Sequence, residues 1–167
     1  MTTSNSQRPG LKGQAIIARD DHLMSGSSVP RYPFVIDHGL GAQAWDVDGN
    51  EYIDFASGIA TTSTGHSHPD VVRAITEQAQ KFIHIAGTDY YYEVQVKLAE
   101  KLAEIAPFKD DARVFLANSG AETIEAAVKM ARFYTGRGHI IAFFGAFHGR
   151  TMGALSLTAS KVVQRDG

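Results

Sequence analysis

The feature that most constrains the fold is the stretch of residues 113–132. Residues 114–116 are apolar and have the composition of a short buried strand. Residues 118–120 (Asn-Ser-Gly) break that run, and Ser119 stands three residues before Glu122, which is the spacing of a capping box at a helix start. Because apolar residues then recur at helical spacing, the stretch predicts a strand, a tight turn and a helix.

The predicted turn has the chemistry of an anion site. A helix that begins at Ser119 directs unpaired backbone N–H groups and a partial positive charge into the turn. Gly120 and Ala121 are small enough to let an anion approach the backbone, so the turn suits a phosphate. The alternative is an ordinary strand-to-helix turn of an α/β domain, and the turn alone does not decide between the two.

A second apolar run, residues 139–144, follows the helix, whose end is marked by Gly136. The order strand, helix, strand predicts a right-handed crossover with parallel pairing. Ligands of open α/β sheets bind beyond the carboxyl ends of strands. Residues 119–121 and 147–150 both follow such ends. We therefore expect them to line one crevice.

Two side chains of the expected crevice have chemistry that suits a ligand. Phe147 could cover a flat ring, and Arg150 could pair with a carboxylate through two hydrogen bonds. His148 adds an imidazole between them. Taken singly, a phenylalanine is more often a core residue and an arginine more often part of a surface ion pair, so both alternatives stay open.

The chain before this region predicts a β-hairpin, several helices and a loop of small residues. Asp48-Gly49 lies between alternating runs and is a strong hairpin signal. Residues 57–65 are small and follow neither period, as in loops that approach a ligand closely. Helical patterns cover residues 14–19, 69–82, 93–106 and 152–163.

Two patterns invite a metal interpretation. Asp46, Asp48 and Asn50 resemble a calcium loop, but such a loop needs its glycine at the sixth position, and here it comes fourth. We interpret Asp48 and Gly49 as the turn, and Asp46 and Asn50 as solvated residues. The spacing His-x-His-x-Asp at residues 66–70 could bind zinc, while the alternative is a helix N-terminus with proline in its first turn.

Composition excludes several classes of function. The formal net charge is −2 with no basic block, so nucleic acid is a poor partner for this chain. The sequence has no cysteine, which excludes disulfides, thiolate catalysis and cysteine-bound zinc. No apolar run has the length of a membrane span, and residues 1–10 lack the apolar core of a secretion signal. We expect a cytoplasmic protein without a membrane partner.

Five short segments follow one another in an order known from one enzyme family. They are residues 45–49 (WDVDG), 54–60 (DFASGIA), 64–69 (TGHSHP), 118–122 (NSGAE) and 145–151 (GAFHGRT). Together they resemble the N-terminal portion of a class III pyridoxal-phosphate aminotransferase. The resemblance implies the α/β, fold type I architecture of aspartate aminotransferase. Residues 1–65 would form a small-domain segment with the β-hairpin, and residues 66–167 the first part of a mainly parallel αβα large domain.

The resemblance implies pyridoxal 5′-phosphate as cofactor and assigns roles to particular residues. Those that would bind the cofactor are Ser119, Gly120, Ala121, Phe147 and His148, and those that would bind the substrate are Ile59 and Arg150. Many relatives have tyrosine in place of Phe147. The lysine that holds the cofactor covalently is expected beyond residue 167, because Lys129 and Lys161 do not fall at the family's position. We therefore expect no catalytic residue and no metal ligand in this chain.

The implied activity is transamination of an omega-amino acid such as 4-aminobutyrate, with 2-oxoglutarate as acceptor. It would belong to a full-length homodimeric enzyme that acts on small amino and 2-oxo acids, and we expect the present piece alone to be inactive. The alternatives are an ornithine or acetylornithine aminotransferase and an amino-acid racemase of the same scaffold. More remote ones are a metal-dependent hydrolase that uses His66 and His68, and a fragment that only folds or associates.

Overall fold

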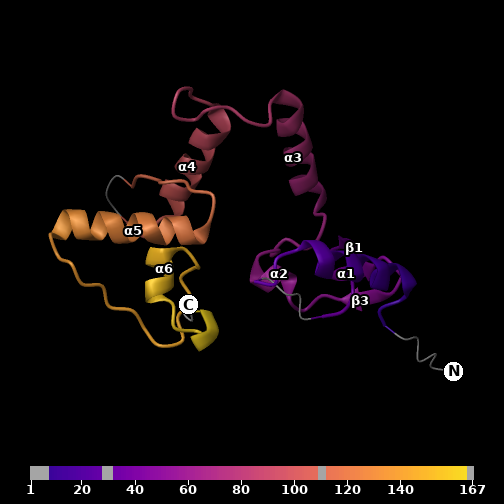
Figure 1. Cartoon of the computed structure of the whole chain (residues 1–167). Coiled ribbons are helices and arrows are strands. Elements are labelled where there is room, and N and C mark those ends of the chain that lie inside the picture. Colours follow the sequence, from indigo (N-terminus) through magenta and orange to yellow (C-terminus); the bar gives the residue numbers. More distant parts are fainter. Residues whose placement is uncertain (1–7, 28–31, 109–111, 165–167) are drawn as a thin grey trace. The chain divides into compact units, whose positions relative to one another are not determined.

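The computed structural model of the chain describes residues 8–27, 32–108 and 112–164. The chain divides into two compact units, an N-terminal unit of residues 1–86 and a C-terminal unit of residues 87–167 (Figure 1). The predicted division into family domains at residue 65 stays a prediction. In the described ranges, no helix has both the length and the apolar character needed to cross a membrane.

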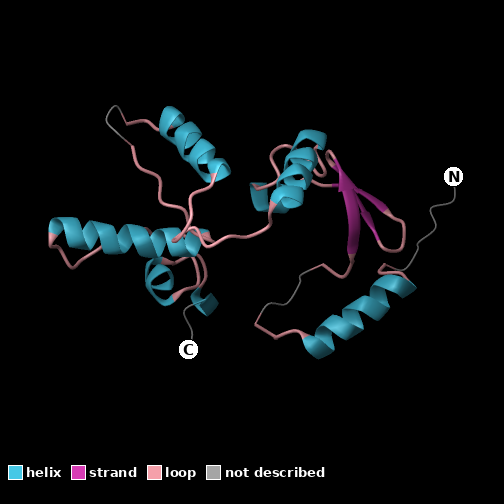
Figure 2. Ribbon diagram, turned by 90° about the horizontal axis from the view of Figure 1, so that it is seen from above, coloured by secondary structure: helices cyan, strands magenta, loops and turns pink. Residues whose placement is uncertain are grey.

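The N-terminal unit combines helices with a small antiparallel sheet (Figure 2). Its elements are α1 (Leu11–Leu23), β1 (Ile36–Leu40), β2 (Gln43–Asp46), β3 (Glu51–Ile53), α2 (Ser57–Ala60) and α3 (Pro69–Lys81). The strand order is β1-β2-β3, and β2 pairs with β3 so that Ala44 faces Tyr52. This confirms the predicted hairpin, whose turn residue Gly49 has the left-handed φ of 84° that glycine accommodates.

A buried carboxylate organises the sheet of this unit. Asp46 is only 4% exposed. Its carboxylate accepts hydrogen bonds from the N–H of Asp48 at 3.0 Å, the N–H of Asn50 at 2.8 Å and the hydroxyl of Tyr52 at 2.7 Å. The interpretation of the Asp46 side chain as solvated was therefore wrong. Its side chain accepts the N–H groups of a tight turn, so these groups do not need water as a hydrogen-bond partner.

The second acid of the turn, Asp48, connects the hairpin to α1. Its two carboxylate oxygens accept the N–H groups of Lys12 and Gly13, each at 3.0 Å. These N–H groups belong to the first turn of α1 and have no partner within the helix. Gly13 is itself buried, and a Cβ there would come within 2.8 Å of the Asp48 carboxylate. Asp48, which was predicted as a turn residue, thus also holds the first turn of α1.

The C-terminal unit consists of helices joined by extended segments (Figure 2). Its elements are α4 (Glu93–Ile105), α5 (Gly120–Thr135), α6 (Met152–Leu157) and the 3₁₀ turn η1 (Val162–Gln164). Helix α4 ends before Pro107, as predicted, because proline cannot donate to the helical ladder. Helix α5 ends at Gly136 with a left-handed φ of 66°, which confirms the predicted C-cap. Helix α6 is shorter than predicted.

The predicted pairing of two parallel strands was wrong. Residues 114–116 and 139–144 form no strand in the described part of the chain, and no hydrogen bond there joins the two segments. A β-strand is defined by its backbone hydrogen bonds to a neighbouring strand. Strands that follow one another along the chain are neighbours in the sheet only about two-thirds of the time. The apolar side chains of Phe115 and Phe143 indicate that these residues need to be buried. They do not indicate which neighbouring strand would pair with them.

Much apolar surface of the chain is uncovered. The buried apolar side chains of the described residues are Ala44 and Ala154 alone, and Phe55, Phe133 and Phe144 are almost fully exposed. Side chains of this size and polarity are usually buried in folded domains, so these residues form faces that need cover.

The Asp46 contacts predict an acid-sensitive N-terminal unit. Burial raises the pKa of Asp46, but the hydrogen bonds from Tyr52, Asn50 and Asp48 outweigh it and lower this pKa from 3.8 to about 2. A folded pKa below the unfolded one gives stability that is present above pH 3.8 and is lost as the pH falls through about 2. We expect Trp45 fluorescence to report loss of structure in that window.

Trp45 is the only tryptophan of the chain, and its ring stacks on His38 with 4.8 Å between centroids, so its emission reports on this unit alone. The variant Asp46→Asn should unfold at lower urea concentration at pH 7 and lose the acid-dependent step. Asp21→Asn, on an exposed position of α1, is the matched control and should behave as wild type. An unchanged acid transition in Asp46→Asn would contradict the assignment.

Candidate functional site

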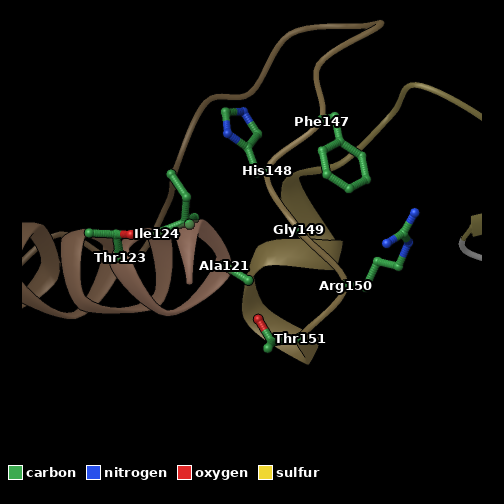
Figure 3. A pocket seen from close by; sticks show the side chains of 9 residues that line it. Ala121, Thr123, Ile124, Phe147, His148, Gly149, Arg150 and Thr151 are labelled. Carbon is green, nitrogen blue, oxygen red and sulfur yellow. The ribbon is translucent and has the colours of Figure 1, made fainter. Parts of the chain in front are cut away.

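The first turn of α5 and the loop of residues 147–151 enclose an open pocket of about 790 Å³ (Figure 3). It lies wholly within the C-terminal unit. Its lining residues are Gly120, Ala121, Thr123, Ile124, Phe147, His148, Gly149, Arg150 and Thr151. The structure thus brings together five of the residues to which the sequence analysis assigned binding roles. Their convergence was predicted, although the strand pairing from which it was argued is absent from the described residues.

The N-terminus of α5 is capped as the sequence predicted. The N–H of Glu122 donates to the Ser119 hydroxyl at 3.2 Å. The Glu122 carboxylate accepts the N–H of Asn118 at 2.6 Å, one residue earlier than a standard capping box uses. Within the described ranges, the N–H groups of Gly120 and Ala121 have no hydrogen-bond partner. These two donors and the positive end of the helix dipole are therefore available to an anion.

Gly120 leaves open space where a side chain would stand. A Cβ built on it would meet no other atom within 4 Å, and its backbone does not have the left-handed φ that would require glycine. No packing or conformational reason for a glycine is visible at this position. A phosphate that approaches the N–H groups of the turn would occupy that space, so the turn fits such a group.

The loop of residues 147–151 rests directly on α5 through another glycine. Gly149 is buried, with φ of 133°, and a Cβ there would lie 2.6 Å from the Cβ and 3.0 Å from the Cα of Ala121. The buried hydroxyl of Thr158 accepts the N–H of His148 at 3.0 Å. The same hydroxyl lies 3.1 Å from the carbonyl oxygens of Gly149 and Ala154, to which it can donate.

Glu125, on the next turn of α5, holds the other end of this loop. Its Oε1 accepts the hydroxyl of Thr151 at 2.6 Å and the N–H groups of Gly153 at 2.8 Å and Ala154 at 3.0 Å. The bond from Thr151, followed by those from the two N–H groups, lowers the pKa of the Glu125 carboxyl. Sequence analysis missed Glu125 and Thr158. The available signal was that Glu125 lies four residues after Ala121, on the same helix face.

The two side chains that suit a ligand lie next to each other. The Arg150 guanidinium carbon is 5.3 Å from the centroid of the Phe147 ring, and Figure 3 shows both on the same side of the loop, with His148 on the other. Phe147 is 51% exposed, so it is not a core residue. Among the described residues Arg150 has no carboxylate partner, so it is not part of an ion pair there. The alternatives of a core phenylalanine and an ion-paired arginine therefore do not describe these two residues.

Ile59, the remaining predicted site residue, belongs to the N-terminal unit. It lies in α2, a four-residue turn that occupies part of the predicted loop. Its φ is 61° and its side chain is 92% exposed. Asp54 holds the start of this turn by accepting the N–H groups of Ala56 at 2.8 Å and Ser57 at 2.9 Å. The substrate-binding role of Ile59 stays a prediction.

The two histidines of the metal alternative have separate structural partners. His66 Nε2 lies 2.7 Å from the carboxylate of Asp54, and this bond is the main cause of the lowered pKa of Asp54. His68 precedes α3, and its Nδ1 accepts the N–H of Asp70 at 3.3 Å. The predicted helix N-terminus is therefore present. Over the described residues, no three histidine, aspartate or glutamate side chains are arranged to hold a metal ion.

Known proteins resemble the chain in both sequence and structure. Over 128 residues it is 52% identical to an acetylornithine aminotransferase of Methanopyrus kandleri, which covers 77% of the chain and 32% of the relative. Over 141 residues it is 45% identical to the 5-aminovalerate aminotransferase DavT of Pseudomonas aeruginosa, covering 81% of the chain and 33% of that protein.

A solved structure, taurine:2-oxoglutarate aminotransferase from Bifidobacterium kashiwanohense in complex with PLP and glutamate, superposes with a TM-score of 0.81. It has 32% identity and covers 92% of this chain and 34% of that one. The chain thus spans about a third of the length of the curated relatives it matches. Its fold is that of a part of the fold type I transaminases. The family model "Aminotransferase class-III" matches residues 24–167, so the chain belongs to the class III aminotransferases, which depend on pyridoxal phosphate.

Proposed function

We propose that the full-length protein is an aminotransferase to which this chain contributes the binding half of the active site. The observation that carries the proposal is the pocket in which the N-terminus of α5 lies beside Phe147 and Arg150. Such a pocket offers donors to a phosphate, an aromatic face to a ring and a guanidinium to a carboxylate. These are the groups that pyridoxal phosphate and an amino acid present together.

In the proposed site, the first turn of α5 binds the cofactor phosphate. The N–H groups of Gly120 and Ala121 donate to phosphate oxygens, and the helix terminus adds about half a positive charge. Ser119 keeps this turn in place through its bond to Glu122. Phe147 covers one face of the pyridine ring, with His148 at the neighbouring position. When bound, the cofactor supplies an electron sink for the substrate carbon that loses its proton.

Arg150 is proposed to orient the substrate. A guanidinium can hold a carboxylate through two parallel hydrogen bonds, which fixes direction as well as position. Since Arg150 lies over the edge of the pocket beside Phe147, a carboxylate bound to it would be held next to the covered ring. Ile59 is proposed to line the apolar part of the substrate pocket. The residue chemistry thus favours an amine that also carries an acid group.

Within that class we propose an omega-amino acid such as 4-aminobutyrate as amino donor and 2-oxoglutarate as acceptor. Two relatives support this choice, because 5-aminovalerate and taurine each carry a terminal amine and an acid group. Ornithine or acetylornithine as donor is the first alternative. A cytoplasmic homodimer completes the proposal and rests on the family resemblance alone.

The proposal is tested with the full-length protein loaded with pyridoxal phosphate. We expect it to form glutamate from 2-oxoglutarate in the presence of 4-aminobutyrate, at a higher kcat/KM than with ornithine or acetylornithine. Chromatography of the products decides the outcome. Faster turnover of ornithine or acetylornithine would move the substrate to that alternative. Appearance of the D-enantiomer of an L-amino acid without a 2-oxo acid would identify a racemase and contradict the proposal.

The open space at Gly120 gives a prediction for the cofactor. Gly120→Ala meets no protein atom and no forbidden backbone angle, so its melting temperature should equal that of wild type. The added methyl should fill the place of the phosphate and weaken pyridoxal-phosphate binding by about tenfold, the loss of one net hydrogen bond. Fluorescence titration of the apo-protein measures this. Gly138→Ala, also free of contacts, is the control, and equal cofactor affinity in the two variants would contradict the phosphate site.

Arg150 gives a prediction for the substrate. Arg150→Ala should raise the KM for the amino donor by about 100-fold, since a charge-assisted pair is lost, and leave the cofactor Kd within about threefold. Arg150→Lys should recover only part of the loss because lysine offers no bidentate geometry. Arg137→Ala, beyond the far end of α5, is the matched control in steady-state assays. An unchanged KM in Arg150→Ala would remove its role.

A further inference from the structure

The carboxylate of Glu125 joins two helices and one loop of the proposed site. All three of its hydrogen bonds converge on a single oxygen, Oε1, from the hydroxyl of Thr151 and the N–H groups of Gly153 and Ala154. These N–H groups belong to the first turn of α6, which has no cap from its own N-terminal residue Thr151. Glu125 of α5 therefore caps α6 and holds the end of the loop at the same time.

The surroundings of Glu125 are shaped to admit this carboxylate. A Cβ on Gly153 would overlap the Glu125 carboxylate oxygens, so only glycine leaves them room. Ala154, which follows, is fully buried. Since Glu125 is not among the residues that line the pocket, its carboxylate is turned to α6 and does not face the proposed ligands. A residue so placed can act on the site only through the atoms it holds.

Those atoms are the anchors of the segment that carries Phe147 and Arg150. Upstream, the N–H of His148 donates to the buried Thr158 hydroxyl at 3.0 Å. Downstream, the Thr151 hydroxyl donates to Glu125 at 2.6 Å. The two anchors are Thr158 and Glu125. Only Glu125 lies on α5, the helix whose N–H groups are proposed to bind the phosphate.

Gly149 packs against Ala121 in the middle of the segment, and Glu125 supplies the hydrogen bond that ties its downstream end to α5. The distance between the phosphate donors and the Arg150 guanidinium thus depends on the Glu125 bonds together with that contact.

We propose that Glu125 is a positioning residue that sets the spacing between the phosphate cradle of α5 and the guanidinium of Arg150. The inference rests on the proposed function and adds the element that fixes its geometry. Glu125 touches neither cofactor nor substrate. Loss of its carboxylate leaves Ser119, Gly120 and Ala121 on α5 in place but frees the loop end, so substrate binding should suffer more than phosphate binding.

The test compares variants of the full-length holoenzyme. Glu125→Ala should raise the amino-donor KM by about tenfold to 100-fold, as expected for a displacement of about 1 Å, while the pyridoxal-phosphate Kd of the apo-protein changes by less than about threefold. Glu125→Gln should restore most of the loss, because its amide oxygen can accept the same three bonds. Glu104→Ala, which removes an exposed ion pair with Lys101 on α4, is the control.

A double-mutant cycle separates positioning from a general loss of stability. If Glu125 acts through Arg150, then Glu125→Ala should raise KM strongly in the presence of Arg150 and by less than about twofold in the Arg150→Ala background. KM increases that multiply would overturn the proposal. An unchanged KM in a folded Glu125→Ala protein would also overturn it.

A second variant keeps the test decisive if Glu125→Ala does not fold. Thr151→Val removes only the hydroxyl that donates to Glu125 and leaves both N–H bonds to α6. We expect a KM increase of about threefold to tenfold in Thr151→Val, and an unchanged KM would overturn the proposal. Wild-type protein without cofactor binding or transamination would overturn the proposed function itself, whereas active wild type with unaffected Glu125 variants would overturn the positioning role alone.

Discussion

The contact between Gly149 and the first turn of α5 is the constraint on which the C-terminal unit depends. The loop can lie this close to Ala121 because Gly149 has no side chain. In the described part of this unit the buried residues, Gly149, Ala154 and Thr158, all gather at this contact. Since none of them has a large apolar side chain, the joint is held mainly by close backbone approach and by hydrogen bonds. The candidate pocket lies directly beside it.

In both units, a carboxylate from another element caps the N-terminus of a helix. At α1, Asp48 of the hairpin accepts the N–H groups of Lys12 and Gly13, and at α6, Glu125 of α5 accepts those of Gly153 and Ala154. In both cases a glycine of the helix makes room for the carboxylate. A carboxylate from another element thus replaces the usual cap from the helix itself. It places a negative charge at the positive end of the helix dipole.

Most local signals were read correctly from the sequence, although the bonds of Asp46 were missed and α6 was predicted too long, whereas the long-range contacts were not predicted. The Asp48-Gly49 turn, the Ser119 cap and the Gly136 helix end depend on residues within a few positions of each other. The bonds of Glu125 to α6 and of Asp48 to α1 span 28 to 36 residues. Helical spacing places Glu125 on the face of Ala121, but no pattern in the sequence identifies the distant partner of either carboxylate. Strand pairing failed for the same reason, because it depends on which neighbour supplies the ladder. Convergence at the pocket was nevertheless predicted, from the position of both segments after apolar runs, although the strand pairing behind that argument is absent from the described residues.

A site that rests on hydrogen bonds can be more exact in direction than one that rests on apolar burial. Apolar burial is roughly proportional to area and has no preferred direction, whereas a hydrogen bond weakens steeply as its angle departs from linear. The loop that carries Phe147 and Arg150 is bound at both ends by such bonds, to Thr158 and to Glu125. Orientation of a bound carboxylate to within a fraction of an ångström needs this kind of support. The chain can therefore define the geometry of the binding half of the site even though most of its apolar faces are uncovered.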